Sequence, residues 1–317
     1  MSEIRKVLSA KDISIAFGLE SPVQVTDKVS FDIFEGEFFA LVGESGCGKS
    51  VTAMSLLGLL PRPSAKVVSG EALLDGIDLL RLSLRDLQKV RGKKVSCIFQ
   101  EPMQALDPVC TIKNQLLEVL REDSKESALQ KIQDGLAAAG FADVDRVLKS
   151  YPCEMSGGML QRISIVMALL PKPELIIADE PTTALDVTVQ ASVLLLLKKM
   201  AAESHTAVLL ITHNMGLVSQ YADRVAVMYA GRIVECGSCA DVIKTPMHPY
   251  TQGLISAIPN GRFDLSHIVP IPGSVPSPEA FVSGCRFAAR CPKADKECEA
   301  FPTRRGNAIH WANCFKI

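Results

Sequence analysis

The segment Gly43-Glu-Ser-Gly-Cys-Gly-Lys-Ser50 has the residue types and the spacing of a phosphate-binding loop. Its glycines allow consecutive backbone N–H groups to point at a polyanion, and a helix that follows presents its positive end. The ammonium of Lys49 would reach the terminal phosphates, and the hydroxyl of Ser50 would bind Mg²⁺. We therefore expect a nucleotide's phosphates to be surrounded by Gly43, Glu44, Ser45, Gly46, Cys47, Gly48, Lys49, Ser50 and Val51.

A second candidate site lies at the end of an apolar run, Leu175-Ile-Ile-Ala-Asp179-Glu180. Successive strand residues point to opposite faces, so the two adjacent carboxylates cannot have the same role. Asp179 suits the coordination of Mg²⁺, and Glu180 can polarise a water for in-line attack on a γ-phosphate. A phosphate loop together with these acids predicts nucleotide hydrolysis.

The elements that must position these residues alternate between strands and helices. The buried run 38–42 precedes the phosphate loop, and a helix is expected over 51–60, where Pro61 ends it. Further strands are predicted at 7–17, 29–34, 95–99, 174–179, 207–211 and 225–229, and further helices at 187–203 and near Leu217. This β-α-β order predicts a parallel sheet covered by helices, and helical spacing over 112–170 predicts a helical insertion within it.

Composition excludes several classes of protein. The chain has 317 residues and a net charge of −1, which gives no basic excess for binding nucleic acid. No run reaches the roughly 18 apolar residues of a membrane span, and the first residues contain no apolar signal core, so we expect the chain to stay in the cytoplasm. Five prolines between 259 and 278 place a domain boundary after residue 258.

The segment Glu154-Met-Ser-Gly-Gly-Met-Leu-Gln161 resembles the signature motif of ABC-transporter ATPases. Other landmarks of that family follow in order: Gln100 resembles the Q-loop glutamine, Ala184-Leu185-Asp186 the D-loop, His213 the switch histidine, and Phe17 the aromatic residue that stacks on adenine. The resemblance implies an α/β P-loop NTPase with a mixed sheet. It places an ABC ATPase domain at 1–258, with a helical signature subdomain over about 101–170, and a small loop-rich extension at 259–317.

Longer motifs resemble the D-type ATP-binding subunits of oligopeptide and dipeptide importers. These motifs are Gly43 to Thr52, Phe99-Gln-Glu-Pro-Met103, Gly157-Gly-Met159, His248-Pro-Tyr-Thr251 and Ile271-Pro-Gly-Ser-Val-Pro-Ser-Pro278. Two positions depart from the family's usual residues, because Leu160 replaces an arginine and Asn214 an aspartate. The resemblance implies ATP hydrolysis coupled to peptide uptake, with a nickel or opine importer, or an ABC ATPase outside transport, as the alternatives.

The resemblance also implies a role for each site residue. Glu180, His213 and Gln100 would act in hydrolysis, and Ser50, Gln100 and Asp179 would hold Mg²⁺. Two ATPase chains would pair head to tail, so that Ser156, Gly157, Gly158 and Asp186 reach the ATP bound to the partner. The implied partners are an F-type ATPase in a heterodimer, two permeases and, indirectly, an extracytoplasmic peptide-binding protein, with no nucleic acid. The chain would then lie peripherally on the cytoplasmic face of the plasma membrane.

The ten cysteines divide into six scattered ones and a group of four. The scattered ones are expected to be small buried hydrophobic residues: Cys47, Cys97, Cys110, Cys153, Cys236 and Cys239. Cys285, Cys291, Cys298 and Cys314 suggest a tetrathiolate site, for a [4Fe–4S] cluster or for zinc, although buried thiols without metal are a third interpretation. Similar tails hold an iron–sulfur cluster in some members of the family, so the resemblance favours the cluster.

Two rival functions remain. A non-transport ABC ATPase would usually carry two nucleotide domains or a long coiled-coil insertion, and this chain has one phosphate loop and about fifty residues between Gln100 and Ser156. An iron–sulfur sensing module with a vestigial nucleotide site would not need a complete set of hydrolytic residues. The single phosphate loop and short spacing argue against the first rival, and the complete set of Lys49, Gln100, Asp179, Glu180 and His213 argues against the second.

Overall fold

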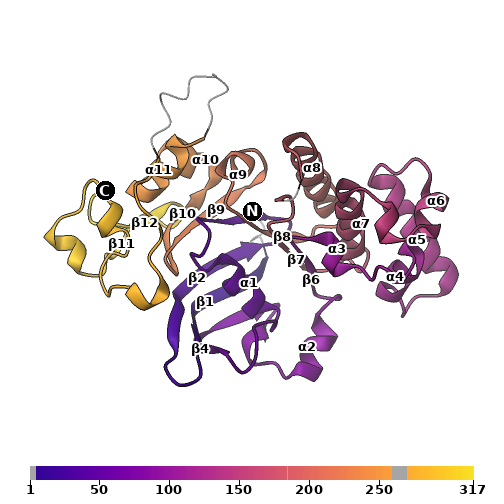
Figure 1. Ribbon diagram of the computed structural model, residues 1–317, viewed down its shortest axis with the longest axis horizontal. Helices are drawn as coiled ribbons and strands as arrows, with labels where there is room; N and C mark the ends of the chain where they lie inside the picture. The colour runs from indigo at the N-terminus through magenta and orange to yellow at the C-terminus, as the bar shows by residue number, and fades with distance from the viewer. Residues whose placement is uncertain (1–4, 184, 259–269) are drawn as a thin grey trace. The chain divides into compact units, whose positions relative to one another are not determined.

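The computed structural model describes residues 5–183, 185–258 and 270–317, and the chain divides into two compact units (Figure 1). The helical unit consists mainly of Ser83–Leu210. The phosphate-loop unit consists of Lys6–Ile33, Glu37–Leu82 and Ile211–Ile317, so it combines segments from both ends of the sequence. No helix among the described residues combines the length and the apolarity needed to cross a membrane.

The phosphate-loop unit contains an antiparallel sheet near its N-terminal end. Its strand order is β2-β1-β4-β5, with β1 at Lys6–Phe17, β2 at Val23–Phe34, β4 at Ala65–Leu74 and β5 at Ile77–Asp78. Strand β1 pairs along most of its length with β4, from Leu8 opposite Leu74 to Phe17 opposite Ala65. A 3₁₀ turn at Leu79–Arg81 follows β5.

The same unit contributes the strand order β11-β12-β10-β9-β3 to a second sheet. The bounds are β3 Phe38–Val42, β9 Arg224–Tyr229, β10 Arg232–Ser238, β11 Arg304–Gly306 and β12 Trp311–Asn313. Strands β3 and β9 run parallel, whereas β10 is antiparallel to both β9 and β12. All five residues of β3 are buried, as expected of a strand covered on both faces.

The helices of this unit are α1 at Lys49–Leu56, α9 at Met215–Tyr221, α10 at Cys239–Lys244 and α11 at Pro249–Ser256. Short 3₁₀ turns at Pro278–Ala280, Ala288–Arg290 and Lys296–Glu299 make up much of the C-terminal segment. This segment packs onto the unit's core, where the ring of Phe287 lies 5.1 Å from that of Tyr229 and 5.3 Å from that of Tyr250. The boundary predicted after residue 258 falls where the described residues stop, and it stays a prediction.

The helical unit has strands β6 Val95–Ile98, β7 Leu175–Asp179 and most of β8 Ala207–Thr212, in the order β8-β7-β6. Helix α2, Leu84–Val90, precedes β6. Helices α3 Pro102–Ala105, α4 Ile112–Val119, α5 Lys125–Ala138, α6 Val144–Lys149 and α7 Gly157–Leu169 lie between β6 and β7, and α8 is Val187–Glu203. Their apolar faces share one core that includes Leu116, Ile132, Leu136 and Ile163.

The mixed α/β architecture and the helical insertion are confirmed. The mixed sheet implied by the resemblance is confirmed too, since β3 and β9 run parallel. Strands β4 and β10 were not predicted, and both pair antiparallel with a neighbour. The first helix spans Lys49–Leu56 rather than 51–60, because Gly48, with φ +104°, caps its start in a left-handed conformation and Gly58 is also left-handed just beyond its end.

Candidate functional site

The phosphate loop connects β3 to α1, as its sequence predicts. Gly46 and Gly48 have φ values of +80° and +104°, a backbone conformation that other residues adopt only with strain. At Gly43 a Cβ atom would lie 2.1 Å from the carbonyl oxygen of Met228, so the start of the loop requires glycine for space. The start of the loop therefore packs closely against strand β9.

The side chain of Lys49 is buried, and its Nζ donates to the carbonyl oxygens of Gly43 at 2.8 Å and Glu44 at 3.0 Å. Cys47 is also buried within the loop, and burial raises the pKa of its thiol, which keeps it neutral beside the ammonium. The loop thus places one cation, without a competing anion from Cys47, at the N-terminus of α1.

Two other predicted site residues belong to the same unit. Phe17 is the last residue of β1 and is half-buried, with the left-handed Gly18 after it. His213 directly follows β8 and is exposed. Their roles toward adenine and γ-phosphate stay predictions.

The carboxylates and Gln100 belong to the helical unit, where parallel strands bring them together. Strand β6 pairs with β7 so that Ile98 lies opposite Ala178. Gln100 and Glu180 each follow that pair by two residues, and the carboxyl ends of parallel strands share one edge of a sheet. The register of β6 and β7 therefore places Gln100 and Glu180 at the same edge of the sheet.

Asp179 ends β7 and is 7% exposed, whereas Glu180 is half-buried and adopts a left-handed φ of +45°. Such a backbone is uncommon for a residue with a side chain, and strain of this kind concentrates at functional sites. The hydroxyl of Thr183 donates to Oε2 of Glu180 at 2.8 Å, which orients the carboxylate. The geometry agrees with different roles for two adjacent acids.

The thiol of Cys97 on β6 lies near the same edge of the sheet, and its pKa responds to the charge there. Burial, and after it the negative charge of Asp179, raise the pKa of Cys97 to about 12. The thiol therefore stays protonated and contributes no charge of its own.

The signature segment lies at the start of α7, in the helical unit. Ser156 is the N-cap and accepts a hydrogen bond from the backbone N–H of Met159 at 3.4 Å. A Cβ at Gly158 would lie 3.0 Å from Cγ1 of Val189, so this turn packs closely against the start of α8. Asp186 is the N-cap of α8, and its Oδ1 accepts from Val189 N–H at 2.9 Å.

The structure therefore brings the signature and the D-loop together, with two helix N-termini side by side. Each helix N-terminus presents backbone N–H groups and a favourable dipole to an anion. Ala184, the first residue of the predicted D-loop, lies outside the described residues.

Both departures from the family's residues have simple structural explanations. Leu160 is 1% exposed and belongs to the helical unit's core. Asn214 is the N-cap of α9, where its Oδ1 accepts from Leu217 N–H at 3.2 Å, a role that aspartate fills equally well.

The predicted residues are thus divided between the two units. Phe17, the phosphate loop and His213 belong to one, and Gln100, Asp179, Glu180, Ser156 and Asp186 belong to the other. That all of them form one nucleotide site stays a prediction.

The four C-terminal cysteines lie near one another in the phosphate-loop unit. Burial raises the pKa of Cys285, and the charges of Cys298, Cys314 and Cys291 raise it further. Cys285 N–H also donates to the carbonyl of Cys298 at 2.9 Å. Backbone N–H groups point at two of the sulfurs, from Lys293 to Cys291 at 3.4 Å and from Lys316 to Cys314 at 3.3 Å. Among the described residues, no group of three or more His, Cys, Asp or Glu side chains is placed so that it could hold a metal ion.

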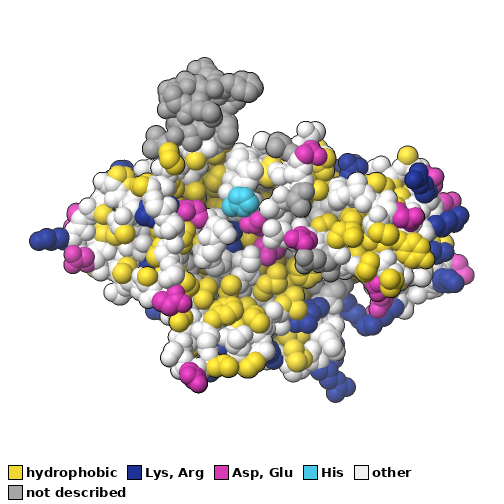
Figure 2. Space-filling model, viewed as in Figure 1, with side chains coloured by type: hydrophobic (Ala, Val, Ile, Leu, Met, Phe, Trp, Pro, Cys, Tyr) yellow, Lys and Arg dark blue, Asp and Glu magenta, His cyan; other side chains and the backbone are white. Residues whose placement is uncertain are grey.

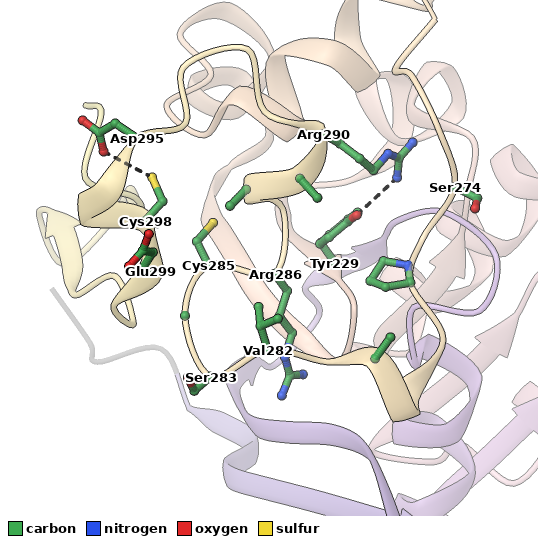
Figure 3. Close-up of a pocket in the computed structure, with 15 residues that line it drawn as sticks. Tyr229, Ser274, Val282, Ser283, Cys285, Arg286, Arg290, Asp295, Cys298 and Glu299 are labelled. Carbon is green, nitrogen blue, oxygen red and sulfur yellow. Dashed lines mark hydrogen bonds between the residues drawn. The ribbon is translucent and has the colours of Figure 1, made fainter.

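A cavity of about 450 Å³ lies beside this group (Figure 3). Cys285, Cys298 and Asp295 line it together with Tyr229 and Arg290. Arg290 and Tyr229 point toward each other across it, joined by a hydrogen bond of 3.4 Å from Nη1 to the phenol oxygen.

Sequence reasoning missed two residues that contact the phosphate loop. The phenol oxygen of Tyr250 accepts from the backbone N–H of Glu44 at 2.9 Å, and Arg290 binds the carboxylate of Glu44. Both residues lie more than two hundred positions away from the loop, and no local spacing marks them. Tyr250 belongs to the motif His248-Pro-Tyr-Thr251 that carries the family resemblance, but the motif assigned it no contact; His248 is the N-cap of α11.

Known proteins match nearly the whole chain. Residues 26–183 match the family described as ABC transporter, and residues 234–298 match the family described as oligopeptide/dipeptide transporter, C-terminal region. The dipeptide transport ATP-binding protein DppD of Bacillus subtilis is 46% identical, over 98% of this chain and 95% of the relative. The oligopeptide transport ATP-binding protein OppD of Escherichia coli is 41% identical, over 93% and 88%.

A solved structure shares the fold. The dimeric structure of MJ0796, described as a bacterial ABC transporter cassette, has a TM-score of 0.63 at 28% identity and covers 73% of this chain and 98% of its own. The same cassette is known in a post-hydrolysis state bound to ADP and Pi. With its phosphate loop, its signature turn and these relatives, the chain belongs to the family of ABC-transporter ATP-binding proteins and is an ATPase.

Proposed function

We propose that this chain is the ATP-hydrolysing subunit of an importer that takes up oligopeptides or dipeptides. The observation that carries the substrate class is the match of residues 234–298 to the oligopeptide/dipeptide transporter C-terminal region. The names of DppD and OppD, relatives over most of the chain, support the same class.

Within the chain, the phosphate loop would bind the β- and γ-phosphates, with Lys49 as the charged ligand. Ser50, Gln100 and Asp179 supply the hydroxyl, amide and carboxylate oxygens that Mg²⁺ prefers, and the ion would neutralise charge that develops on the phosphates. Glu180 would take a proton from the attacking water while Thr183 holds its carboxylate. His213 would contact the γ-phosphate, and Phe17 would stack on adenine.

One chain supplies only part of the site. Ser156 and Gly158 lie at the N-terminus of α7, where an anion bound to a second chain would be stabilised. We therefore propose a head-to-tail dimer with an F-type ATPase subunit, in which ATP bridges the chains. Loss of the γ-phosphate would remove these contacts and open the dimer.

The helical unit carries the surface proposed for the permeases. Phe99, Met103, Val109 and Tyr151 are 39%, 47%, 83% and 42% exposed, although all are apolar or aromatic. Figure 2 shows hydrophobic side chains at the surface over this helical region. Exposed apolar surface of this kind marks protein interaction sites, and Phe99 and Met103 lie beside Gln100 in sequence. The chain would then lie peripherally on the cytoplasmic face of the membrane.

Reconstitution tests this function. The chain, a sister ATPase and two permeases in proteoliposomes, with the peptide-binding protein, should hydrolyse ATP faster when a dipeptide or oligopeptide is added and should accumulate labelled peptide. Accumulation of nickel or an opine in place of peptide would favour the alternative importer. ATP hydrolysis without uptake of any of these would contradict the transport role.

For the C-terminal cysteines we propose a [4Fe–4S] cluster held by Cys285, Cys291, Cys298 and Cys314, with zinc as the alternative. The support is four thiols and the N–H groups directed at two of them, since such hydrogen bonds stabilise metal-bound thiolates. The proposal rests on this donor set and not on a preformed ion site. The bound group would crosslink a segment with little regular structure.

Purification without oxygen, followed by iron, zinc and sulfide analysis, distinguishes the metals. Four irons and four sulfides per chain would support the cluster. One zinc would favour the alternative, and a metal-free but fully folded chain would contradict both.

A further inference from the structure

Arg290, in the 3₁₀ turn Ala288–Arg290 between Cys285 and Cys291, has a side chain that is only 7% exposed. Its Nη1 donates to both carboxylate oxygens of Glu44, at 3.0 and 3.1 Å. Glu44 is the second residue of the phosphate loop. A residue of the cysteine segment is therefore ion-paired to the nucleotide-binding loop of the same unit.

The other nitrogens of the Arg290 guanidinium donate hydrogen bonds as well. Nε donates to the carbonyl of Pro272 at 2.7 Å, and Nη2 donates to that of Gly273 at 3.3 Å. The guanidinium also lies 5.7 Å from the centre of the Tyr229 ring. An arginine fixed at this many points presents a rigid fork, which gives its contact with a carboxylate geometric specificity.

Glu44 is in turn fixed at three atoms. Its carboxylate binds Arg290, its N–H donates to the phenol oxygen of Tyr250 at 2.9 Å, and its carbonyl accepts from Lys49 Nζ at 3.0 Å. The last contact joins Glu44 to the lysine that would bind phosphate. A change at the Glu44 carboxylate is therefore transmitted through one residue to the loop's backbone and its cation.

We propose that Arg290 is a positioning residue of the ATP site, which holds the phosphate loop in its binding conformation through Glu44. The C-terminal extension is then part of the machinery that sets nucleotide affinity. Backbone hydrogen bonds hold the turn that carries Arg290, from Arg290 N–H to the carbonyl of Phe287 at 2.9 Å and from Cys291 N–H to that of Ala288 at 3.2 Å. The inference deepens the proposed function by naming a residue outside every sequence motif.

The test measures MgATP binding by the full chain, through displacement of a fluorescent ATP analogue. Arg290→Ala should weaken binding about tenfold, and Arg290→Lys, which keeps one charge, should lose less. The matched control is Arg304→Ala, an exposed arginine of the same extension that packs on Trp311, 4.2 Å from its ring centre. This control should bind MgATP like the unchanged protein.

Two further measurements separate positioning from packing. Arg290→Ala in the reconstituted ATPase should raise the KM for ATP and leave kcat within about twofold, since saturating ATP restores the loop. Glu44→Gln should weaken binding to a similar extent, and the double variant should be no weaker than Arg290→Ala alone. If Arg290→Ala does not fold, Glu44→Gln tests the same ion pair from the loop side.

Unchanged affinity in both Arg290→Ala and Glu44→Gln would overturn the inference, and so would additive losses in the double variant. These results are independent of peptide transport, because binding of MgATP needs no permease. Failure of peptide uptake with a normal Arg290 effect would overturn the proposed function alone.

Discussion

Ile98 of β6 lies opposite Ala178 of β7 in a parallel register. Gln100 and Glu180 each come two residues after this pair, so both lie at the same edge of the sheet. This relationship, and the left-handed backbone at Glu180, make Glu180 the first residue to test.

Glu180→Gln should retain ATP binding and lose turnover, because an amide cannot accept the proton of the attacking water. The ATPase rate of the reconstituted complex should fall by about 10²- to 10⁴-fold. The matched control is Glu203→Gln, at the exposed end of α8. Unchanged hydrolysis in Glu180→Gln would show that another group is the base.

Lys49→Ala should lose nucleotide binding itself, because it removes the ammonium at the start of α1. A charged hydrogen-bond partner contributes about 1.5–3 kcal/mol, so MgATP affinity should fall at least about tenfold. Lys66→Ala, an exposed lysine on β4 in the same unit, is the control and should bind normally. Equal affinities would remove Lys49 from the phosphate site.

His213→Asn should reduce hydrolysis more than binding, because the imidazole is expected to contact only the γ-phosphate. The ratio of the loss in kcat to the loss in MgATP affinity measures this. His205→Asn, an exposed histidine after α8, provides the matched substitution. A loss confined to affinity would assign His213 to ground-state binding instead.

Cys298→Ser should abolish incorporation of iron or zinc, because one of four thiolate donors is replaced by a hydroxyl that binds these metals weakly. Metal and sulfide content per chain, measured after anaerobic purification, gives the answer. Cys110→Ser, outside the C-terminal group, should keep the same content as the unchanged chain. Full metal content in Cys298→Ser would exclude it as a ligand.

His248 makes stability depend on pH. It is 1% exposed, and burial lowers its pKa from an ordinary 6.5 to about 4. Between these values the unfolded chain binds the proton and the folded chain does not, so stability falls as pH falls. The loss attributable to His248 should be about 2 kcal/mol between pH 7 and pH 5.

Urea unfolding at the two pH values measures this loss. His248→Asn keeps an N-cap acceptor for α11 and cannot titrate, so its stability should fall by less over the same interval. The same pH dependence in both proteins would assign the effect to other groups.

The sequence by itself determined the features that arise within a few residues. The glycine spacing of the phosphate loop and the buried strand 38–42 both depend on local backbone conformation and on burial. For that reason the order of motifs also identified the family correctly. The antiparallel strand β4 escaped prediction because its burial alternates irregularly and its partner β1 is distant in sequence. Strand β10 escaped it because the buried Glu235 interrupts its apolar run.

Only the tertiary structure decided which distant residues meet. Arg290 and Glu44 are separated by 246 positions, and the register of Ile98 with Ala178 spans the whole helical insertion. No periodicity encodes such contacts, because they depend on how complete elements pack once their apolar faces are buried. The link between the cysteine segment and the phosphate loop is therefore a property of the fold, to which each segment's sequence contributes only one of the two charges.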